Sequence, residues 1–472
     1  MTLAALAVAL FALVAVNGQL PVYDDALFFR RFALNLWEHG VWAWNVEDGP
    51  VHGNTSQLWQ GIVALLALVA PDRVALLGRL VAAGSLLGAG ALLMRDRPKA
   101  AVLVGLLSPL VLPTVLSGME TAVTVALGAV LLTVPRAAGA LTVLLYAARP
   151  DTVLLTLPTL ILRRQWAHLA GAVAGICALL ALYHWGYGSA LPLAASLKIA
   201  GVTALEPELV EASVGAGRRH GLHALLAVAP LLVWGWRGWR QALPAALFCA
   251  FHAFVSVDIM GLHGRFFAPA VPWLIVAVRE VRATPLGLLW AVAVAVAFQF
   301  GAIPGDEGWA IGRVSPWTWA AFGLGTAAAC FRPWLLPVLV TLASVGLGSF
   351  AAPLEDRALA MRLRSGTASW QGMGQAVRCV GRDSHAFHSE IGLPGVQFRR
   401  VTDLGGLMAP FDEPFNGLCE RHRPELIWLP HRNYVRKRAE AESSACLTEG
   451  YREVTTTTAA PLWVRNDLNW DC

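Results

Sequence analysis

The sequence predicts a polytopic α-helical membrane protein with a soluble C-terminal domain of α/β or α+β type. Hydrophobic residues make up 56% of the 472 residues and charged residues only 14%, whereas soluble domains carry about 25% charged residues. Mean hydropathy is +0.56. Apolar runs recur from residue 2 to residue 351, and the remainder is charged, with no run of membrane length. We therefore predict a membrane module at 1–352 and a soluble domain at 353–472.

The apolar runs predict about thirteen transmembrane helices. They lie near residues 2–20, 75–94, 100–116, 120–135, 138–148, 152–162, 167–184, 221–236, 243–257, 265–279, 285–302, 315–330 and 333–351. The run at 2–20 lacks the basic start and the small-residue cleavage site of a signal peptide, so we expect an uncleaved helix. The run at 57–71 is shorter than the ~20 residues of a perpendicular span. We interpret it as an interfacial or re-entrant helix.

This topology predicts which side of the membrane each loop occupies. It gathers most basic clusters, such as "RDRPK" at 95–99 and "WRGWR" at 236–240, on one side, which the positive-inside rule assigns to the cytoplasm. Most carboxylates then lie outside. An odd number of spans after a cytoplasmic N-terminus places the tail outside as well. The net charge of +5 suits a protein at a membrane surface, and we predict no nucleic-acid partner.

The loop after the first span contains "YDDALFFRRFALN" at 23–35. If this segment is an interfacial helix, spacings of 7, 4 and 3 place Asp24, Arg31, Asn35 and Glu38 along one face. Apolar residues cover much of the rest and suit the headgroup boundary. An ordinary amphipathic surface helix would show the same pattern, so other clusters have to decide.

Four further polar clusters fall at outer helix ends: "SGMET" (117–121), "ARPD" (148–151), "YGSALPLAASLK" (187–198) and "DIMGLHGRFFAP" (258–269). The residues that we single out in them are Glu120, Arg149, Lys198, Asp258, His263 and Arg265. Each alone could be a solvated or snorkelling charge. Together they supply acids and bases at one membrane face, and shortened helices with polar ends are tolerated at membrane depth where they line a cavity.

Such a set suits the attack of a hydroxyl on a glycosyl phosphate. A carboxylate takes the proton of the incoming hydroxyl, a task that Asp24 or Asp25 fits. Cations hold the phosphate and stabilise its charge as it leaves, a task that fits Arg149, Lys198 and Arg265. A lipid-linked donor would explain why the site lies at the edge of the bilayer.

A transporter or flippase of a lipid-linked sugar is a second interpretation, because it also needs a polar cavity among helices. Transporters often contain two similar halves and polar residues near the midplane. This chain shows no such repeat, and its polar clusters collect at one face. A structural scaffold would not need these clusters.

The ordered motifs resemble a known family. "DDALFFRRFALNLWEHGVWAWN", "VHGNTSQLW", "SGMETA", "ARPD", "YGSALPLAASLK" and "GRFFAPAVP" follow one another along residues 1 to about 430. This order resembles the GT-C superfamily of membrane glycosyltransferases, and most of all the mycobacterial terminal arabinofuranosyltransferases that use decaprenyl-phosphate-arabinose. Their pattern reads D-D-A-Y-I-x-x-R-x-x-x-N, G-Y-T-N-x-L-W, S-G-L-E-T, A-R-P-E, P-N-T-x-x-x-K and R-F-x-x-P.

The resemblance implies a GT-C fold and an inverting transfer from a polyprenyl-phosphate sugar to a cell-envelope glycan or lipid acceptor, on the outer face of a bacterial inner membrane. It implies Asp24 as the base, assisted by Asp25, and donor-phosphate contacts from Arg149, Lys198 and Arg265. The expected substrate-binding residues are Arg31, Asn35, Asn54, Thr55, Glu120, Asp258 and His263. Some relatives use divalent cations, but a monophosphate donor can manage with arginine and lysine, so we expect no required cofactor.

The chain also departs from the family pattern. Leu27 and Phe28 replace the usual Y-I, "GNTSQLW" replaces G-Y-T-N-F-L-W, and no Asn follows Pro192. These changes leave the expected fold intact and leave the sugar, arabinofuranose included, open.

The tail contains short β-rich segments separated by Gly, Pro and Asp, which predict an α/β or α+β domain. Within it, "EIGLPGVQFRRVTDLGGLMAP" resembles the family's I-D-x-x-G-L element, with Asp403 and Leu407 in place. We interpret Asp383, His385 and His388 as surface polar residues rather than metal ligands. The cysteines of the tail predict one or two disulfides, with three full pairings open. They are Cys379, Cys419, Cys446 and Cys472.

Overall fold

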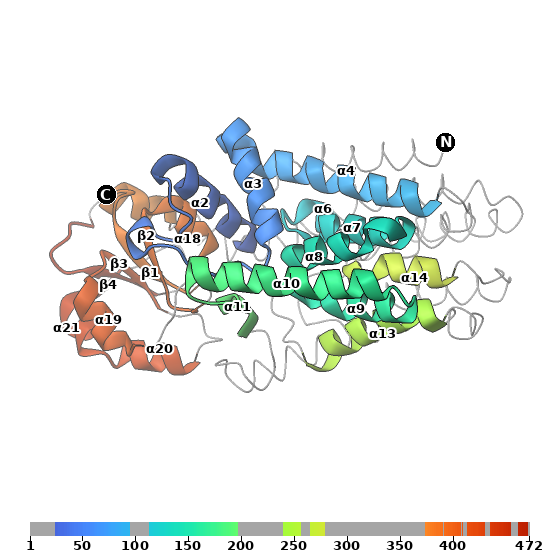
Figure 1. Cartoon of the computed structure of the whole chain (residues 1–472). Coiled ribbons are helices and arrows are strands. Elements are labelled where there is room, and N and C mark those ends of the chain that lie inside the picture. Colours follow the sequence, from blue (N-terminus) through green and yellow to red (C-terminus); the bar gives the residue numbers. More distant parts are fainter. Residues whose placement is uncertain are drawn as a thin grey trace, which may run out of the picture.

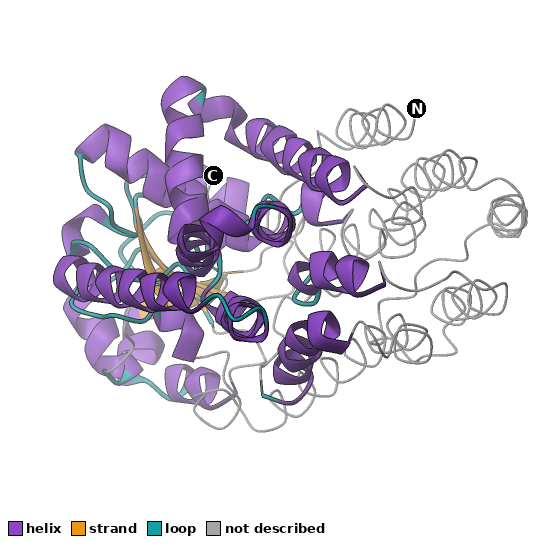
Figure 2. Cartoon of the chain, turned by 45° about the vertical axis from the view of Figure 1, so that its right-hand side comes forward, coloured by secondary structure: helices purple, strands orange, loops and turns teal. Residues whose placement is uncertain are grey.

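The structure is a computed structural model that describes residues 24–94, 113–196, 239–255, 265–278, 373–389, 391–406, 408, 413–429, 435–454 and 461–470. It consists of a helical module and a mixed C-terminal domain at one end of it (Figure 1). Figure 2 shows that the described strands gather at that end and that helices surround them. The predicted domain boundary at 352/353 lies outside the described residues.

The described helices of the membrane module are mostly short. The α-helices are α2 (Asp24–His39), α3 (Gln57–Val69), α4 (Val74–Met94), α6 (Pro113–Leu116), α7 (Thr121–Thr133), α8 (Ala138–Ala148), α9 (Val153–Leu162), α10 (Trp166–Tyr187), α11 (Leu193–Ser196), α13 (Trp239–Phe254) and α14 (Val271–Val278). The 3₁₀ turns are η1 (Val46–Asp48), η2 (Pro71–Arg73), η3 (Pro135–Ala137), η4 (Pro150–Thr152) and η7 (Ala268–Ala270).

Within the described residues, two helices are long and apolar enough to cross a membrane, Pro71–Leu93 and Trp166–Tyr187. They match the predicted spans at 75–94 and 167–184. The predicted spans at 120–135 and 138–148 instead form one broken pair, α7 and α8, which is bent by 110° at the break. Pro135 begins the second arm and cannot continue the first helix. The prediction of about thirteen spans is not confirmed, and those near 2–20, 221–236, 285–302, 315–330 and 333–351 lie outside the described residues, as does most of 100–116.

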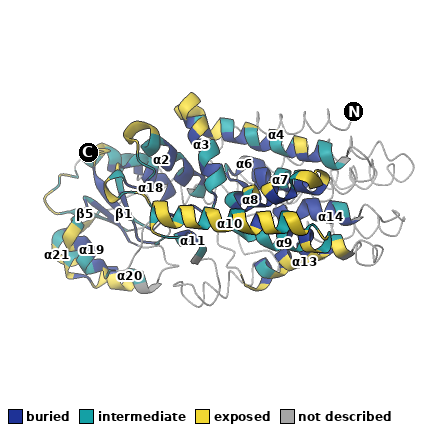
Figure 3. Ribbon diagram, viewed as in Figure 1, coloured by how far each residue is buried: buried dark blue, intermediate teal, exposed yellow. Residues whose placement is uncertain are grey.

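Helix α10 is long, apolar and largely exposed. Ala172 is its only buried residue, and most of its length is exposed (Figure 3). Trp166 is 59% exposed and Trp185 is 84% exposed, one near each end. At 1.5 Å per residue they lie about 28 Å apart along the helix, close to the ~30 Å of a hydrocarbon core. Tryptophan favours both membrane interfaces, so α10 has the length, the apolar surface and the terminal tryptophans expected of a helix that crosses a bilayer.

Helices α7, α8, α9 and α13 share one hydrophobic cluster with Trp273, which is fully buried in α14. Its Nε1 donates to Thr159 Oγ1 in α9 at 2.7 Å. A Cβ on Gly128 of α7 would lie 2.6 Å from the Trp273 ring, so the close approach of α7 and α14 requires glycine there. These contacts fix the segment that begins at Arg265 and leads into α14.

The C-terminal domain is built on a five-stranded sheet in the order β2-β1-β3-β5-β4. Its strands are β1 (His385–His388), β2 (Arg400–Asp403), β3 (Leu426–Trp428), β4 (Tyr451–Val454) and β5 (Leu462–Arg465). Strand β1 pairs in parallel with β2 and β3, and β5 pairs antiparallel with β3 and β4. Its helices are 373–380, α18 (Gly392–Gln397), α19 (Phe415–His422), α20 (Val435–Glu442) and α21 (Ala445–Gly450). The alternation of strands and helices agrees with the predicted mixed α and β domain.

The tail motif has a structural use. Asp403 ends β2 and is buried, and its carboxylate accepts from the backbone N–H groups of Gly405 at 2.7 Å and Met408 at 2.6 Å. The acid thus stabilises the turn that leaves the sheet. Leu407, the other predicted position of this motif, lies outside the described residues.

The prediction of surface positions for the tail's Asp383, His385 and His388 is wrong for His385. Asp383 is exposed and His388 is half-buried, but His385 is buried at the start of β1 and its Nε2 hydrogen-bonds Thr402 Oγ1 at 2.8 Å. Burial, with Arg400 and His422 nearby, lowers the pKa of His385 to about 3. The sequence pattern gave no sign of this, because burial of a histidine at a strand end depends on which helix covers it.

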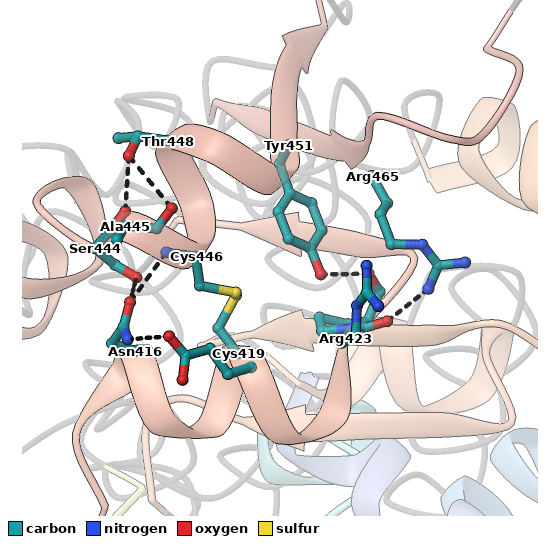
Figure 4. The surroundings of a disulfide bond; sticks show 11 residues. Asn416, Cys419, Arg423, Ser444, Ala445, Cys446, Thr448, Tyr451 and Arg465 are labelled. Carbon is teal, nitrogen blue, oxygen red and sulfur yellow. Dashed lines mark hydrogen bonds between the residues drawn. A yellow bond between two sulfur atoms is a disulfide. The ribbon is translucent and has the colours of Figure 1, made fainter.

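A disulfide joins Cys419 in α19 to Cys446 in α21 (Figure 4). Asn416 reinforces the same junction, because its Oδ1 accepts from Ser444 Oγ at 2.7 Å and from the Cys446 N–H at 3.0 Å. Cys379 is also disulfide-bonded. The prediction that the tail contains disulfides is confirmed, and the Cys419–Cys446 bond is one of the pairings that it left open.

Removing this disulfide should destabilise the C-terminal domain. The sequence separation of 27 residues corresponds, in the chain-entropy model, to about 3.5 kcal/mol. We expect the Cys419→Ala/Cys446→Ala variant to be cleaved faster within α19 and α21 in limited proteolysis. Cys177→Ala, which changes an exposed free cysteine, should match the unmutated protein, and equal cleavage rates for all three would contradict the prediction.

The buried His385 should make the domain sensitive to acid. The unfolded chain binds a proton near pH 6.5, but the native side chain does so only near pH 3, so protons favour the unfolded state in between. Stability should fall as pH falls through this window, by up to about 1.4 kcal/mol per pH unit. Denaturant midpoints of the C-terminal domain between pH 7 and 4 test this. His385→Asn should flatten the dependence, whereas His39→Asn, at a half-exposed position, should leave it unchanged.

Candidate active site

The first aspartates of the chain lie at the start of α2. Asp24 is its first residue, with its side chain outside the described part. The carboxylate of Asp25 is 17% exposed, and Oδ2 accepts from Arg265 Nη2 at 3.2 Å. Two motifs 240 residues apart in the sequence, "DDALFF" and "GRFFAP", therefore meet in one ion pair, as expected if they form one site.

A second charged group forms where α8 ends and η4 begins. Arg149 donates to Asp151 through two bonds, Nη2 to Oδ2 at 2.5 Å and Nε to Oδ1 at 3.2 Å. Its Nη1 lies 3.9 Å from Glu120 Oε1, at the start of α7. His252 of α13 donates from Nε2 to Asp151 Oδ2 at 2.9 Å. A single carboxylate thus fixes both an arginine and a histidine.

The ring of Phe266 connects the two groups. The Cζ atoms of Arg149 and Arg265 each lie 5.2 Å from its centroid, so both guanidiniums contact this one ring. The His252 ring stacks on Phe266 at 5.4 Å with an interplanar angle of 11°. The acid–base cluster, as we name it, comprises Asp25, Glu120, Arg149, Asp151, His252, Arg265 and Phe266. Three carboxylates and two guanidiniums converge in a largely buried position.

Oε2 of Glu120 and Nδ1 of His252, both in the cluster, are buried and have no hydrogen-bond partner in the described part of the chain. A buried polar atom without a partner costs free energy and needs an explanation. A bound ligand with hydroxyl groups would supply partners for both.

Of the remaining predicted residues, some make contacts near the start of α3 and others lie outside the described residues. Asn54 is buried and donates to Gln60 Oε1 at 2.5 Å, while Gln60 donates to the carbonyl of Phe29 in α2 at 2.8 Å. Thr55 is half-buried before Ser56, the N-cap residue of α3. Asn54 thus contributes to holding α3 against α2. Lys198, Asp258 and His263 lie outside the described residues.

Arg31 and Asn35 make their contacts away from the acid–base cluster. Asn35 Nδ2 donates to the carbonyls of Ala43 and Trp44, both at 2.9 Å. The guanidinium of Arg31 is buried against the C-terminal domain, and burial lowers its pKa to about 9, so it stays charged at neutral pH. The structure therefore gives both residues protein partners.

Sequence reasoning missed His252 and Phe266. His252 lies inside the predicted span at 243–257, in "FCAFHAF", and the apolar run concealed it. An ionisable residue within a predicted span is a functional-site signal by itself, and this signal was available. Phe266 is the F of the segment compared with R-F-x-x-P, but the sequence indicated no role for it, because that role depends on the three side chains that surround it. No group of three or more His, Cys, Asp or Glu suited to a metal ion is found among the described residues.

A comparison with solved structures finds the crystal structure of ArnT from Cupriavidus metallidurans bound to undecaprenyl phosphate, with a TM-score of 0.57, 14% sequence identity and coverage of 97% of both chains. This chain has the ArnT fold. The fold expected from the motif order agrees with this likeness over nearly the whole length. Neither protein-family models nor curated proteins give a match to this chain. At this level of identity, the likeness to ArnT concerns the fold, and the chemistry has to be argued from the residues.

Proposed function

We propose that this chain is an inverting glycosyltransferase that moves a sugar from a polyprenyl-phosphate donor to a cell-envelope glycan or lipid acceptor. The contact that carries the proposal is Asp25 with Arg265, beside Arg149 on the Phe266 ring. The carboxylate next in sequence to the proposed base Asp24 thus lies with two cations that can bind phosphate. The ArnT structure, a protein of the same fold, holds undecaprenyl phosphate, which supports a lipid phosphate as donor.

The reaction is a single displacement. The acceptor oxygen attacks the anomeric carbon as its proton passes to a carboxylate, and the bond from that carbon to the phosphate oxygen breaks. Polyprenyl phosphate leaves as a monoester with one more negative charge than it carried in the phosphodiester to the sugar. Asp24 takes the proton, and Asp25 orients the acceptor. Arg149 and Arg265, with Lys198, stabilise the departing phosphate through charge-assisted hydrogen bonds, so this proposal requires no metal.

The other polar residues fit substrate hydroxyls. Glu120 has a buried oxygen without a partner, which suits a sugar O–H donor. We assign Asp258 and His263 to the same role on the strength of the motif alone. The nature of the sugar, arabinofuranose or another, follows from none of these contacts and is the first question for experiment.

The outer face of a bacterial inner membrane is the location that we propose for this site. The Cys419–Cys446 disulfide supports it, because such bonds persist in oxidising compartments. The distribution of basic loops supports the same orientation. A C-terminal domain exposed to the cytoplasm would be kept reduced.

Transfer by purified protein from a panel of synthetic polyprenyl-phosphate pentoses and hexoses tests the function. We expect one donor class to release polyprenyl phosphate and yield a glycosylated acceptor, both detected by mass spectrometry. Asp24→Asn should lower the rate by about 10²- to 10⁴-fold, the usual contribution of a general base, without loss of donor binding.

The matched control is Asp72→Asn, at an exposed position in η2, which should keep the unmutated rate. Transfer by Asp24→Asn at the unmutated rate would exclude Asp24 as the base. Donor binding without any transfer, combined with movement of the lipid across vesicle membranes, would favour the flippase instead.

Loss of the Arg265 guanidinium should weaken binding of the donor phosphate. Because a charged hydrogen bond contributes about 1.5–3 kcal/mol, Arg265→Gln should raise the Kd for undecaprenyl phosphate by about 10- to 100-fold. Arg73→Gln, at an exposed position beside Asp72, serves as the control. An unchanged Kd for Arg265→Gln would remove this residue from the phosphate site.

A further inference from the structure

Arg31 has all of its hydrogen-bond donors occupied by protein groups. A guanidinium carries five N–H groups. Nε donates to the carbonyl of Trp44 at 2.5 Å, and Nη1 donates to the carbonyls of Gly395 and, at 2.8 Å, Phe398. Nη2 donates to Asn45 Oδ1 at 2.7 Å and to the carbonyl of Arg399 at 2.6 Å. This leaves no N–H of Arg31 for a substrate.

The five acceptors belong to two parts of the chain. Two come from Trp44 and Asn45, in the loop that follows α2, and three come from residues 395–399, at the end of α18 in the C-terminal domain. Carbonyls in the last turn of a helix lack helical partners and accept such donors readily. Arg31, itself in α2, therefore binds three segments together from a buried position.

A second set of contacts runs along the same junction. Trp44 Nε1 donates to the carbonyl of Val401 at 2.9 Å, and Asn45 pairs with Val401 in both directions at 3.0 Å. A Cβ added to Gly395 would lie 2.3 Å from the Trp44 ring, so only glycine fits there. Ion pairs from Asp48 to Arg400 and from Glu47 to Arg399 close its rim.

The junction also has an apolar core that belongs to both parts. Phe28 and Phe32 of α2 and Trp44 of the following loop pack in one cluster with residues of the C-terminal domain. The partners from that domain include Met373, Ile391, Phe398, Val401 and Trp428. Helix α2 is thus held by the C-terminal domain on one side and by α3 on the other.

We propose that Arg31 is a positioning residue through which the C-terminal domain fixes the aspartates of α2 in the active site. This rests on the proposed function, since it concerns the same carboxylates. Asp25 lies six residues before Arg31 on one helix, about 9 Å along its axis, so a tilt at the junction displaces it. A displacement near 1 Å can cost about 10²-fold in rate.

Two variants on opposite sides of the junction test the proposal. Arg31→Lys keeps the charge but offers a point donor that cannot reach both the loop and residues 395–399. Gly395→Ala introduces the Cβ that meets Trp44, in a domain with no proposed substrate contact. We expect both to lower kcat by about 10- to 100-fold, with the Kd for undecaprenyl phosphate unchanged within about twofold.

The matched control is Gly374→Ala, in the helix at 373–380 of the same domain, where an added Cβ meets only the far end of Arg378 at 3.8 Å. It should keep the unmutated kcat. If Gly395→Ala fails to fold, as judged by size-exclusion chromatography, Trp44→Phe replaces it. That variant keeps an aromatic ring but removes the bond to Val401 and part of the indole packing, and we expect a smaller fall in kcat.

Hydrogen–deuterium exchange of the α2 amides provides a readout that does not depend on transfer. Exchange at residues 24–39 should quicken in Arg31→Lys and Gly395→Ala and stay unchanged in Gly374→Ala. If the unmutated protein transfers no sugar, the proposed function fails, while this readout still tests the coupling. Unmutated kcat and exchange in Gly395→Ala, or a raised Kd with unchanged exchange in Arg31→Lys, would overturn the positioning role.

Discussion

The ion pair between Asp25 and Arg265 is the interaction on which the site depends. It joins the beginning of the chain to a segment 240 residues later, and both partners are largely shielded from water. Charges in such surroundings persist when each has a partner. The same constraint accounts for Arg149, whose guanidinium is held between Asp151 and Glu120 and contacts the Phe266 ring that Arg265 also contacts. The helices that end at these residues are placed by the need to keep the opposite charges together.

The sequence predicted a functional role for Asp25, Glu120, Arg149 and Arg265 because they lie at the ends of apolar runs. A charged residue in such a setting is a signal of function. The sequence also predicted the GT-C fold from the order of the motifs and the mixed tail from its short β-rich segments. It failed where tertiary contacts decide. The partners of Arg31 are mostly backbone carbonyls, which every residue carries and no pattern reveals. The role of His252 was missed because its neighbours in the sequence are apolar. The burial of His385 was missed because the sequence does not show which elements cover β1. The bend at Pro135 turned two expected spans into the arms of one pair.

The division into a membrane module and a soluble domain describes the composition better than it describes the packing. Residues of α2, which belong to the membrane module by sequence, share a hydrophobic cluster with β1, β2 and β3. Composition separates the two parts because lipid and water select different residues. Composition does not reveal a junction at which aromatic residues of one part, such as Phe28 and Trp44, complete the core of the other. The C-terminal domain therefore has a direct physical connection to the helix that carries the aspartates.

The tryptophans near the two ends of α10 also indicate how deep the neighbouring segments lie relative to a bilayer. Trp185 is exposed near one end of α10, as expected at a membrane interface, and the neighbouring residues Tyr183 and Tyr187 contact the ring of His52 at 4.9 and 5.0 Å. His52 belongs to the segment that joins α2 to α3, so this segment lies level with that end of α10, the depth expected for lipid headgroups. A phosphate carried on a long isoprenoid would already be at that height while its tail remained in the leaflet. Such a substrate would arrive by sideways diffusion within the bilayer, and its two-dimensional concentration, rather than its solubility, would set how often the site is filled.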